Sequence, residues 1–213
     1  FLWGFRCKEF YETAYFNKIK KTVHTVIDVE FGADVFSHWP VTQPRDHKYD
    51  FCFLASRNMA KWHLIRPYLC SFKDRYSGII NGPGWNSKDQ IVRRDRHLNV
   101  YHNSRIGINF HIGASHCERS ELNERTYNLA LAGIPQLVDH TPLLYQRFAK
   151  DQLVSFDDVG SFKSNLKMLV DDAGLASEMA AKSYAHVMKK HTNIHRAHHF
   201  VNKLADLIKD KAV

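Results

Sequence analysis

The chain has 213 residues, of which 44% are hydrophobic and 24% are charged, which suits one substantial globular domain with or without appendages. The formal net charge of +8 favours anionic partners such as nucleotides, nucleic acid or an acidic membrane face. Lysines and arginines are nevertheless spread along the chain, without the dense stripe and interleaved aromatics of a polynucleotide-binding protein, so we do not expect nucleic acid as the partner.

The first 45 residues contain a helical pattern over residues 5–21 and a linker-like stretch, PVTQP, over residues 40–44. The chain begins at Phe1 without an initiator methionine and without the pattern of a signal peptide, so we expect a piece of a longer protein. We therefore predict that residues 1–45 are an N-terminal segment and linker from an upstream half. Residues 46–213 are then a separate domain.

From residue 49 onward, short apolar segments alternate with helical patterns. The predicted strands are residues 49–55, 78–81, 105–110, 136–138 and 153–156. The predicted helices are residues 59–72, 87–103, 123–132, 142–149, 161–171, 175–190 and 193–210. The first of these helices contains Pro67 and is expected to kink or end early. The alternation predicts an α/β fold, a Rossmann-like doubly wound parallel sheet with C-terminal helices.

Ligands of such sheets bind beyond the carboxyl ends of the strands. Arg57 and Lys61 follow the first strand, where they either clamp a diphosphate or are solvated surface cations. The second strand runs into a Gly-Pro-Gly-Trp turn, in which Gly82 lets backbone approach a ligand and Trp85 either stacks on a base or covers the sheet edge. No Gly-x-Gly-x-x-Gly or Walker loop is present, so neither dinucleotide nor P-loop binding is indicated.

The third strand runs into His111, a position at which catalytic or sugar-contacting groups occur in this fold class. A loop histidine can equally be a plain surface residue. The next segment, SELNERTYNLALAGIPQLVDHTP over residues 120–142, predicts a short helix that starts near Ser120 or Asn123 and stops at Gly133. Its free N–H groups and the positive end of the helix dipole predict an anion site.

The two faces of this short helix differ in character. Tyr127, Ala130 and Leu131 have the spacing of one buried face. On the opposite side, polar residues fall within a turn of one another, namely Glu121, Glu124 or Arg125, and Asn128. The arrangement suits a charged ligand rich in hydroxyl groups.

The cysteines and histidines indicate neither disulfides nor a metal site. The four cysteines are far apart and form no CxxC pair, so a reducing cytoplasm is the default compartment. His191, His195, His198 and His199 could share one helical face, but no cysteine or carboxylate joins them and they lie far from the strand ends. We expect a solvated surface there, and no metal.

Taken together, these segments resemble the C-terminal, donor-binding half of a GT-B-fold glycosyltransferase, most of all the CgeB-like (spore-maturation-type) group. The resemblance covers roughly residues 46–204. It depends on RIGINFH (105–111), LNERTYNLALAGIP (122–135), DHTP (139–142), the aspartates 157 and 158 before a helix, and His191-Thr192 with Arg196.

The resemblance implies that a nucleotide-diphosphate sugar is the donor, that no metal is needed, and that a missing N-terminal half binds an unknown acceptor. It places Arg57 and Lys61 near the diphosphate. The region from His111 through Asn123 and Arg125 to Asn128 would lie near sugar, phosphate and ribose. Relatives commonly carry a glutamate where this chain has Asn128, and an amide cannot act as a charged double acceptor. Glu121 could supply that carboxylate.

We therefore expect a glycosyltransferase donor domain in which Arg57, Lys61, Arg125 and helix N-terminal amides stabilise the departing nucleotide diphosphate. His111 would contact the transferred sugar. Two alternatives stay open. One is a non-catalytic nucleotide-sugar-binding or scaffolding domain on the same fold, and the other is a nucleotide-sugar epimerase. Peripheral membrane contact through the basic surface also stays open, without a dedicated anchor.

Overall fold

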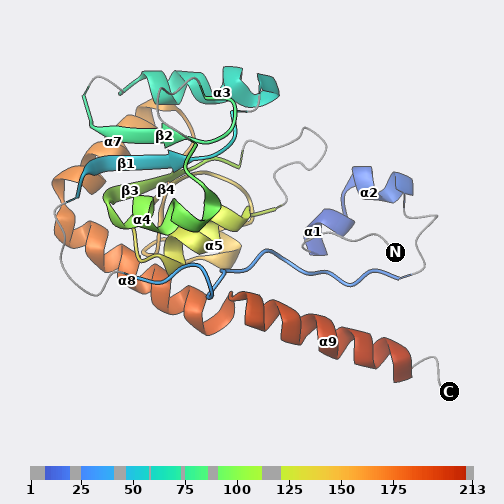
Figure 1. Ribbon diagram of the computed structural model, residues 1–213. Helices are drawn as coiled ribbons and strands as arrows, with labels where there is room; N and C mark the ends of the chain where they lie inside the picture. The colour runs from blue at the N-terminus through green and yellow to red at the C-terminus, as the bar shows by residue number, and fades with distance from the viewer. Residues whose placement is uncertain are drawn as a thin grey trace.

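The computed structural model describes residues 8–19, 25–40, 47–57, 59–72, 75–85, 91–111 and 121–209. Five parallel strands form one sheet in the order β2-β1-β3-β4-β5, with helices on both faces (Figure 1). The strands are β1 (Tyr49–Leu54), β2 (Gly78–Asn81), β3 (Ser104–Asn109), β4 (Gln136–Asp139) and β5 (Val154–Phe156). The predicted α/β fold is confirmed, and each predicted strand end lies within one residue of the observed one.

The helices are α1 (Lys8–Tyr11), α2 (Ala14–Ile19), α3 (Met59–Cys70), α4 (His97–His102), α5 (Glu124–Leu131), α6 (Leu144–Arg147), α7 (Val159–Asp171), α8 (Ala173–Lys190) and α9 (Asn193–Lys209), with a 3-10 turn η2 (Arg94–Arg96) before α4. The last three and α5 agree with the sequence prediction. The helix predicted over residues 142–149 is reduced to the single turn of α6.

Three other predicted helices differ from the structure. The helix expected over residues 5–21 breaks before α2, where the Thr13 hydroxyl accepts a hydrogen bond from the Phe16 N–H and donates one to the Phe10 carbonyl. The helix expected over residues 87–103 begins, within the described residues, only at η2. Of the two outcomes expected at Pro67, a kink or an early end, the early end is wrong, because α3 continues to Cys70. Pro67 is exposed, so water can hydrate the carbonyl that lacks its helical donor.

Alternate residues of β1 build the two halves of the core. Phe51 and Phe53 pack with the apolar side chains of α3 and α7 on one face of the sheet. Cys52 and Leu54 pack with those of α4 and α5 on the other. This period-2 pattern with both faces apolar is expected for a parallel strand covered on both sides.

The N-terminal segment 25–40 packs against the domain along the junction of α8 and α9. Ala33 pairs with Thr192 in a parallel bridge, its N–H donating to the His191 carbonyl at 2.7 Å and its carbonyl accepting from the Asn193 N–H at 2.9 Å. Further along, a ring nitrogen of His102 lies 2.7 Å from the Trp39 carbonyl. Residues 41–46 lie outside the described residues, so the boundary between residues 45 and 46 stays a prediction.

Among the residues that the structure describes, no helix is long and apolar enough to cross a membrane. Figure 1 shows α9 running on beyond the sheet toward the C-terminus. Cys52 is buried and free, as the apolar strand predicts, and burial raises the pKa of its thiol to about 12.

Gly133 ends α5 with a left-handed backbone, φ +70°, and its N–H donates to the Ala130 carbonyl. A Cβ at this position would lie 2.9 Å from Cβ of Pro40. We predict that Gly133→Ala lowers the free energy of unfolding by about 1–2 kcal/mol, because a left-handed non-glycine residue is strained. Denaturant unfolding would measure the change.

Gly174→Ala is the matched control, because a Cβ there meets only Asp172 Oδ1, at 3.4 Å, and Gly174 lies in the first turn of α8. Its free energy of unfolding should stay equal or rise by up to about 1 kcal/mol. Equal effects of the two substitutions would contradict the role given to Gly133.

Candidate functional site

The strand order 2-1-3-4-5 has its switch point between β1 and β3, since the chain leaves β1 toward α3 on one face and leaves β3 toward α5 on the other. The crevice beyond the carboxyl ends of β1 and β3 is therefore the expected ligand site. The residues predicted from the sequence come from the segments that follow β1, β2 and β3 and from the start of α5.

A reciprocal pair of amide hydrogen bonds fastens the start of α5 to the end of β3. Asn109 Nδ2 donates to Asn123 Oδ1, and Asn123 Nδ2 donates to Asn109 Oδ1, each at 3.0 Å. Asn123 is also the N-cap of α5, accepting from the Thr126 N–H at 3.2 Å, and it donates to the Phe110 carbonyl. The predicted helix start at Asn123 is confirmed, but its side chain is fully used within the chain.

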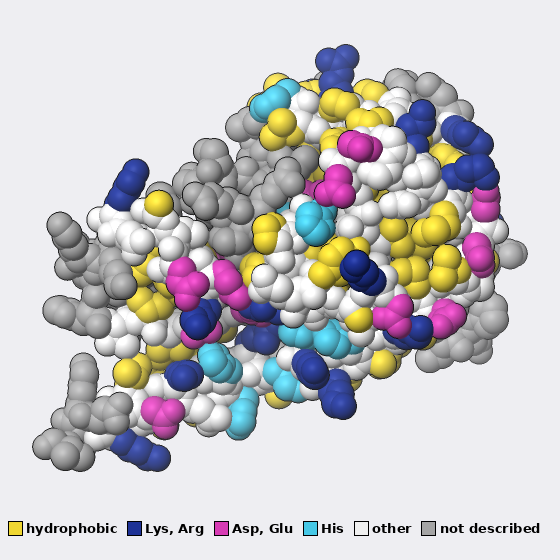
Figure 2. Space-filling view, turned by 180° about the vertical axis from the view of Figure 1, so that it is seen from behind, with side chains coloured by type: hydrophobic (Ala, Val, Ile, Leu, Met, Phe, Trp, Pro, Cys, Tyr) yellow, Lys and Arg dark blue, Asp and Glu magenta, His cyan; other side chains and the backbone are white. Residues whose placement is uncertain are grey.

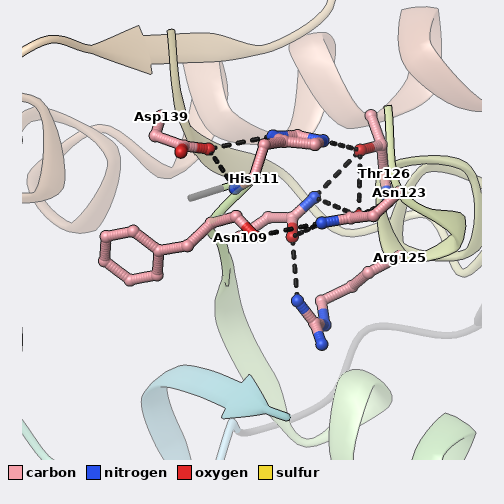
Figure 3. Close-up of polar contacts among 7 residues, drawn as sticks. Asn109, His111, Asn123, Arg125, Thr126 and Asp139 are labelled. Carbon is pink, nitrogen blue, oxygen red and sulfur yellow. Dashed lines mark hydrogen bonds and ion pairs between the residues drawn. The ribbon is translucent and has the colours of Figure 1, made fainter. Parts of the chain in front are cut away.

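Arg125 lies at the switch point. Its Nη1 donates to Asn109 Oδ1 at 2.9 Å (Figure 3). Its guanidinium carbon lies 5.5 Å from the centre of the Phe53 ring of β1. The side chain is half-buried, and this burial lowers the pKa of its guanidinium from the ordinary value. No carboxylate of the described residues forms an ion pair with Arg125.

His111 is buried, with 1% of its side chain exposed. Its Nδ1 lies 2.9 Å from Asp139 Oδ1 and its Nε2 lies 2.8 Å from Thr126 Oγ1, while its backbone N–H donates to the same Asp139 oxygen at 2.6 Å. Both ring nitrogens thus have partners within the chain. The sugar contact predicted for His111 has no free ring nitrogen in this conformation and stays a prediction.

Arg57 lies against two tryptophans. Its guanidinium carbon is 4.8 Å from the ring centre of Trp62 and 5.9 Å from that of Trp85. The indole N–H of Trp85 donates to the Ala55 carbonyl at 2.7 Å. Trp85 therefore covers the end of β1, the simpler of its two predicted roles, and also contacts a cation.

Gly82 allows the segment that follows β2 to approach the segment that follows β1, which includes Arg57. Its φ is +140°, and a Cβ there would lie 2.3 Å from the Ala55 carbonyl oxygen. The Arg57 N–H donates to the Pro83 carbonyl at 2.8 Å in the same contact. The close approach predicted for Gly82 is thus made to the chain itself. Lys61 lies in the first turn of α3, but its side chain is outside the described residues.

Asn128 is buried at 6% exposure, which corrects its placement on the open face of the short helix. Its Oδ1 accepts from the Asp34 N–H at 2.9 Å, and its Nδ2 donates to Glu124 Oε1 at 3.3 Å. The carboxylate beside Asn128 is therefore that of Glu124. Glu121 instead lines a small pocket that also includes Glu30, Tyr127 and Arg147. Segment 25–40, which belongs to the N-terminal segment predicted to lie apart from the domain, thus reaches the predicted site.

Histidine side chains gather on the face formed near the junction of α8 and α9 (Figure 2). His191 is buried, with its Nδ1 accepting from Arg196 Nη2 at 2.7 Å, and His195 Nδ1 lies 2.7 Å from Thr192 Oγ1. Within the described ranges, no three His, Cys, Asp or Glu side chains are grouped to hold a metal ion. The contacts of His191 and His195 join the end of α8 to the start of α9.

A model of the glycosyl transferase-like family matches residues 62–202. The chain belongs to this family. The match includes β3, α5 and the C-terminal helices as far as residue 202, and it begins after β1. It does not reach the N-terminal segment, and it does not confirm the finer CgeB-like subgroup, which stays a prediction.

Solved structures share the fold of this glycosyl transferase-like chain. Sucrose-phosphate synthase from Thermosynechococcus elongatus is 9% identical with a TM-score of 0.70, over 97% of this chain and 58% of that one. A TarM mutant from S. aureus, in complex with fondaparinux, alpha-GlcNAc-glycerol and UDP, is 10% identical with a TM-score of 0.56, over 87% and 41%. Both are GT-B glycosyltransferases, so the GT-B resemblance is confirmed at the level of fold. A comparison with curated proteins finds no match.

Sequence reasoning missed four residues of the site: Asn109, Thr126, Asp139 and Trp62. Asn109 and Asp139 end β3 and β4 and lie within one residue of the predicted strand ends, so their position was a usable signal. Thr126 and Trp62 lie in helical patterns, where nothing in the spacing separates a site residue from a packed one.

The contact between Asn128 and Glu124 predicts a pH-dependent effect of Asn128→Asp. The new carboxylate still accepts from the Asp34 N–H, but it lies beside Glu124, so its pKa rises above that of an unfolded chain. We expect a loss of about 1–3 kcal/mol in the free energy of unfolding at pH 7, shrinking toward pH 4 as the carboxylates protonate. Denaturant unfolding at both pH values would measure it.

Adding Glu124→Gln to that variant is the control, because the glutamine amide can donate to the new carboxylate. The ion pair that Glu124 forms with Arg94 is largely exposed and contributes little. The double variant should recover most of the stability at pH 7. A pH-independent loss in the single variant would contradict the predicted repulsion.

Burial, followed by the charge of Arg196, lowers the pKa of His191 to about 3. As the pH falls below about 6.5, the unfolded chain takes up a proton that the folded chain refuses, so stability falls. We predict that His191→Gln weakens this fall, which is on the order of 1 kcal/mol per pH unit, when unfolding at pH 7 and pH 5 is compared. The exposed His198, changed to Gln, should leave it unchanged.

Proposed function

We propose that this chain is the donor-binding domain of a glycosyltransferase and that it holds a nucleotide-diphosphate sugar at the carboxyl ends of β1 and β3. Arg57 and Arg125 would bind the diphosphate, with Lys61 as a third cation. The family supports glycosyl transfer in general. The TarM mutant of the same fold was determined with UDP, which makes UDP the first nucleotide to test.

The observation that favours this proposal is that two of the half-buried arginines form ion pairs with carboxylates and two do not. Four described arginines are half-buried: Arg57, Arg125, Arg147 and Arg196. Arg147 and Arg196 form ion pairs with Glu30, and Arg147 also with Glu9. Arg57 and Arg125 form no ion pair with any described carboxylate. A partly desolvated guanidinium without an anion is unfavourable, so an external anion suits these two.

The chemistry follows from where the two cations lie. Glycosyl transfer from a nucleotide-diphosphate sugar leaves negative charge on the departing diphosphate, and planar guanidinium groups bind phosphate oxygens in pairs. Rings fix both groups: Trp62 and Trp85 beside Arg57, and Phe53 beside Arg125. Cations held in place before reaction stabilise developing charge without reorganising, so a metal ion is not required by this scheme.

The acceptor would be bound by residues outside this chain, which spans 58% and 41% of the two structural neighbours. The described free cysteines, Cys52 and Cys70, are consistent with action in the cytoplasm. Peripheral contact with a membrane through basic residues remains part of the hypothesis.

A donor-binding domain without catalytic activity of its own is the second candidate. It is favoured by the internal partners of His111 and Asn128, whose polar atoms are engaged by the chain rather than directed at a ligand. Mixing the chain with donors and measuring release of the free sugar or nucleotide would separate the two. Binding without release would favour this second candidate.

We predict that Arg57→Ala and Arg125→Ala each weaken binding of the nucleoside diphosphate by about 10-fold or more, because each removes charge-assisted hydrogen bonds to phosphate. Isothermal titration calorimetry with UDP, GDP, CDP, ADP and TDP would measure the affinities and identify the base. The control is Arg66→Ala, an exposed arginine on α3. Equal affinities in all three variants would refute the assignment of the two cations.

A further inference from the structure

A network of hydrogen bonds joins the ends of β3 and β4 to the start of α5 (Figure 3). The donor and the acceptor of each bond can be assigned from what each group can donate. Arg125 only donates, so Asn109 must turn its oxygen toward Arg125 and its Nδ2 toward Thr126. Thr126 Oγ1 accepts that bond at 2.9 Å. Its own proton then has two acceptors within reach, His111 Nε2 at 2.8 Å and Asn123 Oδ1 at 3.3 Å, of which the histidine nitrogen is the nearer.

The far end of the network agrees with this assignment. If His111 Nε2 accepts from Thr126, a neutral ring carries its proton on Nδ1. Nδ1 lies 2.9 Å from Asp139 Oδ1, which also accepts from the His111 backbone N–H at 2.6 Å. An ionised carboxylate only accepts, so it selects the same tautomer. Asp139 therefore selects the tautomer, and the shorter distance from Thr126 to His111 favours the same one.

The burial of these groups strengthens the argument. Asp139 is 4% exposed and Thr126 is 0% exposed, so little water can replace a lost partner. Among the described residues, Asp139 Oδ2 has no hydrogen-bond partner. The hydrogen bonds that this carboxylate accepts within the described part of the chain therefore go to His111.

We propose that Asp139, His111, Thr126 and Asn109 form a relay that positions Arg125 at the switch point. His111 is held as the neutral Nδ1–H tautomer by Asp139, and its Nε2 orients the Thr126 hydroxyl. Thr126, together with the amide of Asn123, orients Asn109, whose oxygen holds the guanidinium. Each of the four is a positioning residue, because it acts through Arg125. The relay itself stands on contacts within the chain, and only its effect on a ligand rests on the proposed function.

The first test needs no ligand. In protein labelled with ¹⁵N-histidine, the two-bond ¹H–¹⁵N spectrum distinguishes the tautomers, and comparison with His111→Gln assigns the His111 signals. At pH 7.5 we expect the Nδ1–H tautomer, with Asp139→Ala shifting the ring toward Nε2–H. An Nε2–H ring in the unsubstituted protein, or a tautomer insensitive to Asp139→Ala, would overturn the relay.

The second test uses inorganic pyrophosphate, because the relay acts on an anion contact and not on a base. Thr126→Val should lower pyrophosphate affinity about fivefold, the effect of one lost hydrogen bond, whereas Thr126→Ser should retain it. Thr141→Val is the matched control, because the Thr141 hydroxyl is fully buried and has no hydrogen-bond partner within the described residues. The pyrophosphate affinity of Thr141→Val should equal that of the unsubstituted chain.

A double-mutant cycle separates positioning from general loosening of the fold. In an Arg125→Ala background, Thr126→Val should have no further effect on pyrophosphate affinity, because its effect passes through Arg125. Additive losses would overturn the coupling. If the unsubstituted chain binds neither pyrophosphate nor any nucleoside diphosphate, the proposed function fails and with it the relay's effect on a ligand. The tautomer spectrum still decides whether the relay exists.

Discussion

The two hydrogen bonds exchanged between the amides of Asn109 and Asn123 hold the first turn of α5 against the carboxyl end of β3. Because Asn123 caps α5 and Asn109 ends β3, this pair fixes the direction of the helix relative to the sheet. The direction of the helix in turn fixes the directions of the side chains on the first turn of α5. Arg125 crosses toward β1, and Thr126 turns under the helix toward His111. The rest of the site depends on that geometry.

Strands and the ends of α5 could be predicted from the sequence because each is fixed by local signals. β1, with Phe51 and Cys52 at its centre, carries apolar side chains on both faces. Such a run is typical of a parallel strand that is covered by helices on both sides. Asn123 and Gly133 are residues preferred at the two ends of a helix, and both have those roles here. The sheet followed from the alternation of these elements, without any contact being known.

The contacts of the site could not be predicted because they join residues far apart in sequence. Asn128 is engaged by the backbone of Asp34, 94 residues earlier, and His111 by Asp139, 28 residues later. A helical pattern states which residues share a face, but it does not state what covers that face. The helical pattern therefore predicted that Asn128 lies on an exposed polar face.

The attachment of segment 25–40 has a consequence for how the chain folds as it is made. Its partners in the domain include Asn128, His191 and Asn193, with Arg196 bonded to the carbonyl of Phe31. A ribosome releases this segment early and those partners late, at about 5–20 residues per second. Segment 25–40 is therefore made before the surface that it covers, and its full set of contacts forms only after the start of α9 has emerged.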